Sequence, residues 1–183
     1  RPARRLLSAA PMADLAIAAW EKRVNSPQTS SVGRLFDAAA ALIGVTREQS
    51  YEGEAAMRLE ALATGKSNSD ALPLNKDGAL WRADWAPLLP LLMSEERSPA
   101  ERAALLHATL AATLREQAVI LREESGECGE FNITRVGLAG GVFQNRVLVA
   151  HVLRELASAG FTVFIPERLP VNDAAIAFGQ IVE

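Results

Sequence analysis

The most constraining feature of this sequence is a strand, helix, strand pattern close to its end. Residues Thr134–Leu138 form a short apolar run, Asn145–Ala159 repeat apolar residues at helical spacing, and Thr162–Ile165 form a second apolar run. Two strands joined through a helix must be parallel, and such crossovers are almost always right-handed. The pattern predicts a helix-rich α/β fold with a small parallel sheet, and a last helix is expected over Asp173–Val182.

The part of the chain before this unit, residues 12–125, is predicted to be helical. Helices are expected over Met12–Val24, from Ser30 or Ser31 to Gly44, over Gly53–Ala63, and from Ser98 to Gly126. The last of these begins Ser-Pro-Ala-Glu, which suits a capping box with proline in the first turn. Thr64–Gly78 is rich in turn formers and is interpreted as a surface excursion, while Trp81 and Trp85 are placed on one helical face. We predict one lobe over residues 1–183, with the helical part followed by the strand and helix part at 133–183.

Composition excludes several classes of protein. The 183 residues are 49% hydrophobic and 22% charged with a net charge of −3, which is typical of a globular domain and argues against nucleic-acid binding. No run approaches the ~20 apolar residues of a membrane span, and no secretory signal opens the chain, so we expect a cytoplasmic protein. The single cysteine, Cys128, leaves neither a disulfide within the chain nor a cysteine-rich zinc site. The basic run Arg1–Arg5 is interpreted as a solvated end.

Two segments hold residues that suit a ligand. In LAGGVFQN, Gly140 and Gly141 let the backbone approach a ligand closely, and the start of the following helix suits a phosphate. The spacing matches neither the dinucleotide-binding fingerprint nor the P-loop. In PVNDAAIAFGQ, Asp173 can be a helix cap, a metal ligand or a contact to a bound molecule at the same end of the sheet. His107, among leucines, is interpreted as a half-buried structural histidine.

Four segments with specific wording follow one another along the chain: SPQTSSVGRLFDAAAALIGV at 26–45, SYEGEAAMRLEALA at 50–63, GGVFQN at 140–145 and NDAA at 172–175. In this order they resemble the HypF family of hydrogenase maturation carbamoyltransferases, which usually has NDGG in place of NDAA. The resemblance implies the C-terminal part of such an enzyme, a partial lobe of the sugar-kinase and Hsp70-like ATPase fold. The chain starts with arginine rather than methionine, which also suggests a piece of a longer protein.

The resemblance also implies roles for particular residues. The acidic residue of GRLFDA matches one that holds ribose hydroxyls, the glycine of SYEGE borders the sugar, and the GGVFQN turn frames the adenosine. The residues thereby assigned to the adenylate are Asp37, Gly53, Gly140, Gly141 and Asn145. Asp173 matches a metal-binding aspartate. The family's other ligands form an HxxxH motif, which His107 and His151 do not, so an iron or zinc site is expected to be incomplete here.

The implied function is the transfer of a carbamoyl group from a carbamoyl-adenylate, made from carbamoyl phosphate and ATP, to the C-terminal cysteine of a HypE-type partner. The product would lead to the cyanide ligands of nickel-iron hydrogenase, and this chain alone is expected to be inactive. Two hypotheses stay open beside it: an O-directed or tRNA-directed carbamoyltransferase, and a non-catalytic nucleotide-binding or assembly module. We expect no nucleic-acid or membrane partner, and helices or a second copy, in a homodimer, should cover the edge of the small sheet.

Overall fold

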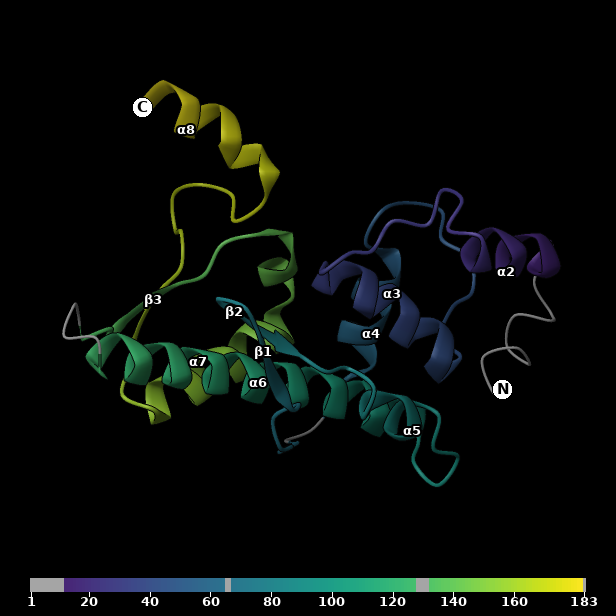
Figure 1. The fold of residues 1–183 in the computed structure, drawn as a ribbon, viewed down its shortest axis with the longest axis horizontal. Coiled ribbons are helices and arrows are strands. Elements are labelled where there is room, and N and C mark those ends of the chain that lie inside the picture. Colours follow the sequence, from purple (N-terminus) through teal and green to yellow (C-terminus); the bar gives the residue numbers. More distant parts are fainter. Residues whose placement is uncertain (1–11, 65–66, 128–131, 183) are drawn as a thin grey trace.

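Helices dominate the computed structural model, which describes residues 12–64, 67–127 and 132–182 and contains two small sheets in these ranges (Figure 1). The helices are α2 (Ala13–Glu21), α3 (Val32–Ile43), α4 (Glu54–Leu62), α5 (Leu88–Leu92), α6 (Pro99–Glu127), α7 (Arg146–Ser158) and α8 (Ile176–Val182), with 3-10 turns η1 (Gly141–Gln144) and η2 (Asp173–Ala175). The strands are β1 (Leu74–Asp77), β2 (Leu80–Ala83), β3 (Arg135–Gly137) and β4 (Thr162–Phe164). This composition confirms the predicted helix-rich α/β class.

The predicted strand, helix, strand unit is present. β3 and β4 pair in parallel, with Arg135 opposite Thr162 and Gly137 opposite Phe164, and η1 and α7 connect them. α7 packs against both β4 and α6, so the crossover helix covers the sheet. This arrangement places the glycine turn at the carboxyl end of β3, where ligands bind in open α/β sheets.

α6 is the central element of the core. It runs along the body of the molecule (Figure 1), and α3, α4, α5 and α7 all pack against it. The predicted capping box starts it: the Glu101 N–H donates to Ser98 Oγ at 3.3 Å, and the Ser98 N–H donates to Glu101 Oε2 at 2.7 Å. The largest fully buried side chains of the described residues are Phe36, Leu59, Leu88, Leu92, Leu106, Leu156, His107 and Val152.

β1 and β2 form an antiparallel hairpin that corrects two predictions. The end of the expected surface excursion, Thr64–Gly78, is strand, and Gly78 turns the chain with φ 61°. Trp81 lies in β2 and Trp85 in the turn before α5, so they share no helix. Three of the four residues of β1, Asn75, Lys76 and Asp77, have low strand propensity, so the sequence pattern did not predict the hairpin. A tertiary contact holds it instead, because the Trp81 indole donates to Glu124 Oε2 of α6 at 3.1 Å.

Several other expectations have definite outcomes. His107 is fully buried rather than half-buried, because α3 and α7 cover α6 at that turn. α8 follows η2 as the expected last helix, but it projects from the body and buries no side chain.

Cys128 and Arg1–Arg5 lie outside the described residues, and the boundaries of the lobe stay a prediction. No helix within the described ranges is long and apolar enough to span a membrane.

Candidate functional site

A groove with a volume of about 940 Å³ lies where α3, α4, the glycine turn and η2 meet. We call it the acidic groove, because the carboxylates of Asp37, Glu52, Glu60 and Asp173 line it together with one guanidinium, that of Arg34. Its other lining residues are Ser31, Val32, Gly33, Phe36, Gly53, Ala56, Met57, Gly141, Val142, Gln144, Asn145 and Asn172. Such a field favours hydroxyl donors or cations over anions.

Five of the six residues assigned from the sequence meet in this groove. They are Asp37, Gly53, Gly141, Asn145 and Asp173. The sixth, Gly140, does not line it. Gly140 has φ 108° and its N–H donates to the carbonyl of Val171 at 2.6 Å, which ties the turn to the segment that carries Asp173. The convergence is observed, whereas the binding role of each residue stays a prediction.

Asp37 lies on α3, which Ser31 caps by accepting the Arg34 N–H at 3.4 Å. Its side chain is 16% exposed, and Oδ2 is buried. That oxygen lies 3.1 Å from Arg34 Nη2 as an ion pair but has no hydrogen-bond partner. This carboxylate oxygen therefore has unused acceptor capacity, although it is buried rather than open to the groove. Two ribose hydroxyls could reach both oxygens only if Arg34, whose side chain is 56% exposed, turns away.

The N-terminus of α7 is already bonded within the chain. The Leu148 N–H donates to Asn145 Oδ1 at 2.9 Å, and the Arg146 N–H donates to Glu60 Oε1 at 2.8 Å. Asn145 is 7% exposed, so its side chain is a buried cap. Asn145 and Glu60 thus occupy two N–H groups that an anion at this helix start would use, and the phosphate expected there stays a prediction.

The SYEG segment shapes the opposite wall. Gly53 takes φ 82° at the N-cap of α4, a conformation that favours glycine. Glu54 follows it, is buried, accepts the Ser50 N–H at 2.6 Å and pairs with Arg58 at 2.5 Å. The Ser50 N–H first, and Arg58 in addition, hold the pKa of Glu54 below its ordinary value. This buried carboxylate fixes the turn that brings Gly53 to the groove.

Asp173 is exposed at the end of the groove, and Asn172 rather than Asp173 is the cap, accepting the Ala174 N–H at 3.2 Å. Among the described residues, no three His, Cys, Asp or Glu side chains gather where they could hold a metal ion. The residues described here therefore do not fit a metal centre by themselves. Ala174 and Ala175, the departures from NDGG, are not among the residues that line the groove.

Sequence reasoning missed other groove residues, Glu52, Glu60, Gln144 and Asn172. A signal for Glu60 was present, because Met57 and Glu60 share one face of α4 and follow its N-cap, Gly53, at helical spacing. Gln144 and Asn172 stand beside assigned residues, but nothing in their local pattern shows which way they point.

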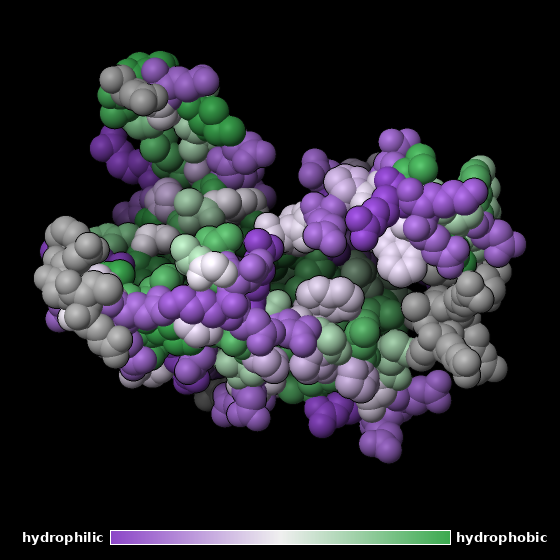
Figure 2. Space-filling model, in the orientation of Figure 1, coloured by the Kyte–Doolittle hydropathy of each residue, from purple (hydrophilic) through white to green (hydrophobic). Residues whose placement is uncertain are grey.

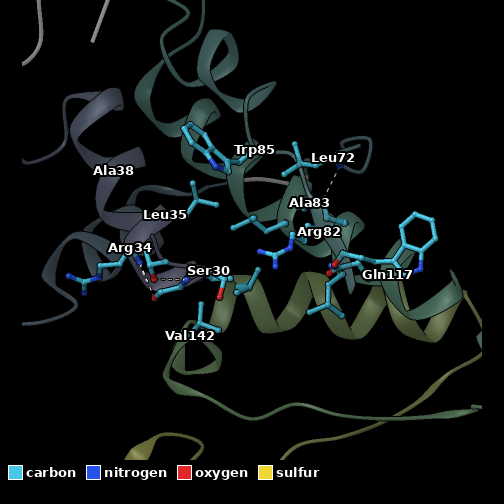
Figure 3. A pocket seen from close by; sticks show the side chains of 18 of the residues that line it. Ser30, Arg34, Leu35, Ala38, Leu72, Arg82, Ala83, Trp85, Gln117 and Val142 are labelled. Atoms are coloured by element: carbon cyan, nitrogen blue, oxygen red, sulfur yellow. Dashed lines mark hydrogen bonds between the residues drawn. The ribbon is translucent and has the colours of Figure 1, made fainter. Parts of the chain in front are cut away.

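A second groove of about 700 Å³, which we call the apolar groove, lies between α3, the hairpin and α6 (Figure 3). Leu35, Leu72, Trp85 and Val142 line it, and the Leu72 N–H donates to Thr113 Oγ1 of α6 at 2.9 Å. The two grooves share Ser31, Val32, Arg34 and Val142. In Figure 3 the Arg34 side chain extends away from the apolar groove, in keeping with its pairing to Asp37.

Similar protein sequences define the class of protein to which this chain belongs. The family model for the carbamoyltransferase Kae1-like domain, second subdomain, matches residues 2–180. The carbamoyltransferase HypF of Rhodobacter capsulatus is 44% identical over 177 residues, which cover 96% of this chain and 22% of that protein. The HypF of Synechocystis is 37% identical over 166 residues, which cover 89% of this chain and 20% of the relative.

Solved structures agree with these matches. The crystal structure of full-length HypF in a phosphate- and nucleotide-bound form superposes with a TM-score of 0.85 at 30% identity, covering 97% of this chain and 28% of that one. The structure of T. kodakarensis HypF gives a TM-score of 0.68 at 27% identity, covering 97% and 23%. The chain belongs to the HypF carbamoyltransferase family and spans about a fifth of the length of the relatives it matches.

Proposed function

We propose that this chain supplies the nucleoside-binding wall of a HypF-type carbamoyltransferase. In this proposal the acidic groove holds the adenosine part of a carbamoyl-adenylate formed from carbamoyl phosphate and ATP. The carbamoyl group then passes to the C-terminal cysteine of a HypE-type partner in the maturation of nickel-iron hydrogenase. The observation that carries the proposal is the meeting of four separate motif segments, through Asp37, Gly53, Gly141 and Asn145 with Asp173, in one groove.

The electrostatics of the groove support a nucleoside rather than a bare phosphate. Four acidic residues and one arginine line the groove, so its charge is mainly negative. Ribose hydroxyls are neutral donors, and carboxylates accept hydrogen bonds from them well. The full-length HypF on which this chain superposes was solved in a phosphate- and nucleotide-bound form, so that protein binds a nucleotide. We therefore assign the sugar to Asp37 and place the phosphate away from the start of α7.

We further infer that the chain is part of a longer protein that provides the rest of the reaction. The two relatives named above are about five times as long as the matched segment, and α8 exposes Ile176, Phe178 and Ile181. If iron or zinc takes part, Asp173 can supply one ligand, and the remaining ligands must come from other residues. No step of adenylate formation is assigned to a residue of this chain, so pyrophosphate release from ATP and carbamoyl phosphate should stay at background.

Calorimetric titration with adenosine tests the proposal. Replacing Asp37 by Asn should weaken binding about tenfold or more, because a charge-assisted hydrogen bond contributes roughly 1.5 to 3 kcal/mol. Asp77→Asn is the matched control: Asp77 also pairs with an arginine, Arg82, at 3.1 Å, but lies in the hairpin outside the groove. Absence of adenosine binding by the unaltered chain, or equal losses in both variants, would overturn the assignment.

A further inference from the structure

His107 is a polar side chain in the middle of the core. It is 0% exposed on α6, and the Phe36 ring of α3 packs edge-on against it with ring centroids 5.2 Å apart. A buried imidazole costs stability unless both ring nitrogens have partners. Both do, and one partner is a residue of the acidic groove.

The two contacts define the protonation of the ring. Nδ1 lies 2.7 Å from the carbonyl oxygen of Ala103, which can only accept, so Nδ1 carries the proton. Nε2 lies 2.9 Å from Asn145 Nδ2. The orientation of that amide is set independently, because Asn145 Oδ1 accepts the Leu148 N–H. Nδ2 therefore donates to a neutral, Nδ1-protonated imidazole.

Asn145 links this core contact to the groove. It caps α7, lines the groove beside Gly141 and Gln144, and ends η1. A shift of its amide moves the end of the glycine turn and the start of α7 together. The wall of the groove formed by residues 141–145 is thus held against α6 by one side-chain hydrogen bond from the core.

We propose that His107 is a positioning residue for the acidic groove, acting as a neutral acceptor that holds Asn145 and with it the glycine turn. The consequence for a ligand rests on the proposed nucleoside function, whereas the positioning itself does not. A protonated ring would present an N–H to the Asn145 amide, so two donors would face each other and the wall would loosen.

Burial favours the neutral form of the His107 ring. It lowers the pKa of His107 from the ordinary 6.5, and His151 of α7 adds to the lowering, while the hydrogen bond to the Ala103 carbonyl and the charge of Glu60 on α4 oppose it. Because the folded-state value is depressed, the stability contributed by neutral His107 is complete above pH 6.5 and is lost as pH falls through the lower folded value. Adenosine affinity should fall in the same direction.

Nitrogen-15 NMR of the imidazoles gives the first test. The chain has two histidines, and His151 Nδ1 accepts from Arg154 Nη2 at 2.7 Å, so the two rings should be opposite tautomers. We expect His107 protonated at Nδ1 and His151 at Nε2, with His151→Gln assigning the signals. In the His151→Gln protein, protection of the Leu148 amide from exchange should fall as His107 titrates. An Nε2-protonated His107, or Leu148 protection independent of its titration, overturns the proposal.

A pair of amide variants gives the second test. His107→Gln can place an acceptor near the Nε2 position, whereas His107→Asn can keep the donor to Ala103 but falls short of Asn145. At pH 8, the His107→Asn variant should bind adenosine about five- to tenfold more weakly than the parent, as expected for the loss of one hydrogen bond. The His107→Gln variant should retain most of the affinity. Thr113→Val, another buried polar side chain of α6, should lower stability without changing adenosine affinity.

The outcomes separate the two proposals. If the unaltered chain binds adenosine and the Asn and Gln variants bind it equally well, positioning is overturned while the nucleoside site stands. If the unaltered chain does not bind adenosine, the proposed function fails, and the tautomer and Leu148 protection still decide the positioning. If His107→Asn does not fold, the tautomer of His107 and the exchange protection of the Leu148 amide still decide whether His107 positions Asn145.

Discussion

At the scale of residues, the two glycines of the turn have different physical requirements. Gly140 takes φ 108° and ψ 151°, a region that is essentially closed to side chains. Gly141 has no such strain, and a Cβ built on it would lie 3.8 Å from Asn172 Cβ, an ordinary contact at the edge of the acidic groove. The backbone therefore needs the first glycine, whereas a side chain at the second would lie beside Asn172, which also lines the groove.

Substitutions at these neighbours should separate folding from binding. Gly140→Ala is expected to lower the free energy of unfolding by about 1–3 kcal/mol through backbone strain. Gly141→Val should leave that free energy within about 1 kcal/mol of the parent, in the range of mild substitutions, yet weaken adenosine binding by narrowing the groove. Urea unfolding and calorimetry on both proteins measure the two effects. Equal destabilisation by both changes would contradict the division of roles.

At the scale of elements, α6 organises its neighbours by side-chain contacts along its length. The hairpin is joined to it by Trp81 and Lys76, which both contact the Glu124 carboxylate. These two contacts, Lys76 first, hold the pKa of Glu124 below its ordinary value. The hairpin is short and polar, so its position depends on α6 more than on strand propensity.

Two glycine substitutions test this element-level view. Gly78→Ala should destabilise the chain by about 1 kcal/mol, because Gly78 has φ 61°, the left-handed region that disfavours side chains. Gly126→Ala, in the last turn of α6 with open space around it, should stabilise by up to about 1 kcal/mol. Guanidinium unfolding curves compare the two. Should Gly78→Ala leave the free energy of unfolding unchanged or raise it, the hairpin turn would not need its glycine.

At the scale of the whole molecule, stability is unevenly distributed. The core lies around α6 and α7, where Leu156 is 0% exposed, while Ile181 of α8 is 82% exposed. Figure 2 shows hydrophobic residues over the projecting α8. α8 packs against η2 and buries none of its own side chains. It should therefore open without unfolding the body.

A core substitution and an α8 substitution should differ sharply. Leu156→Ala is expected to cost about 2–5 kcal/mol, the usual range for a buried leucine. Ile181→Lys should change the free energy of unfolding by no more than about 0.5 kcal/mol, as exposed substitutions do. Thermal and urea unfolding of both variants give the comparison. A loss above 2 kcal/mol from Ile181→Lys would show that α8 packs on the body in solution.

Local chemistry made several features predictable from the sequence alone. The capping box at Ser98, the glycine that ends α3, and the apolar periods of β3, α7 and β4 depend on neighbours within a few residues. The resemblance to family motifs predicted six site residues, and all but Gly140 line the acidic groove. The hairpin was missed because its strands carry weak local signals.

Tertiary structure decided how those residues are used. The Glu60 carboxylate reaches the Arg146 N–H across 86 positions, and His107 reaches Asn145 across 38. No local pattern encodes such pairs, since they form only when packing of α4, α6 and α7 brings the partners within hydrogen-bond distance. The sequence by itself determined the helices other than α5, the parallel unit and the family. Folding in three dimensions decided that the start of α7 is bonded internally and that a buried histidine holds the wall of the groove.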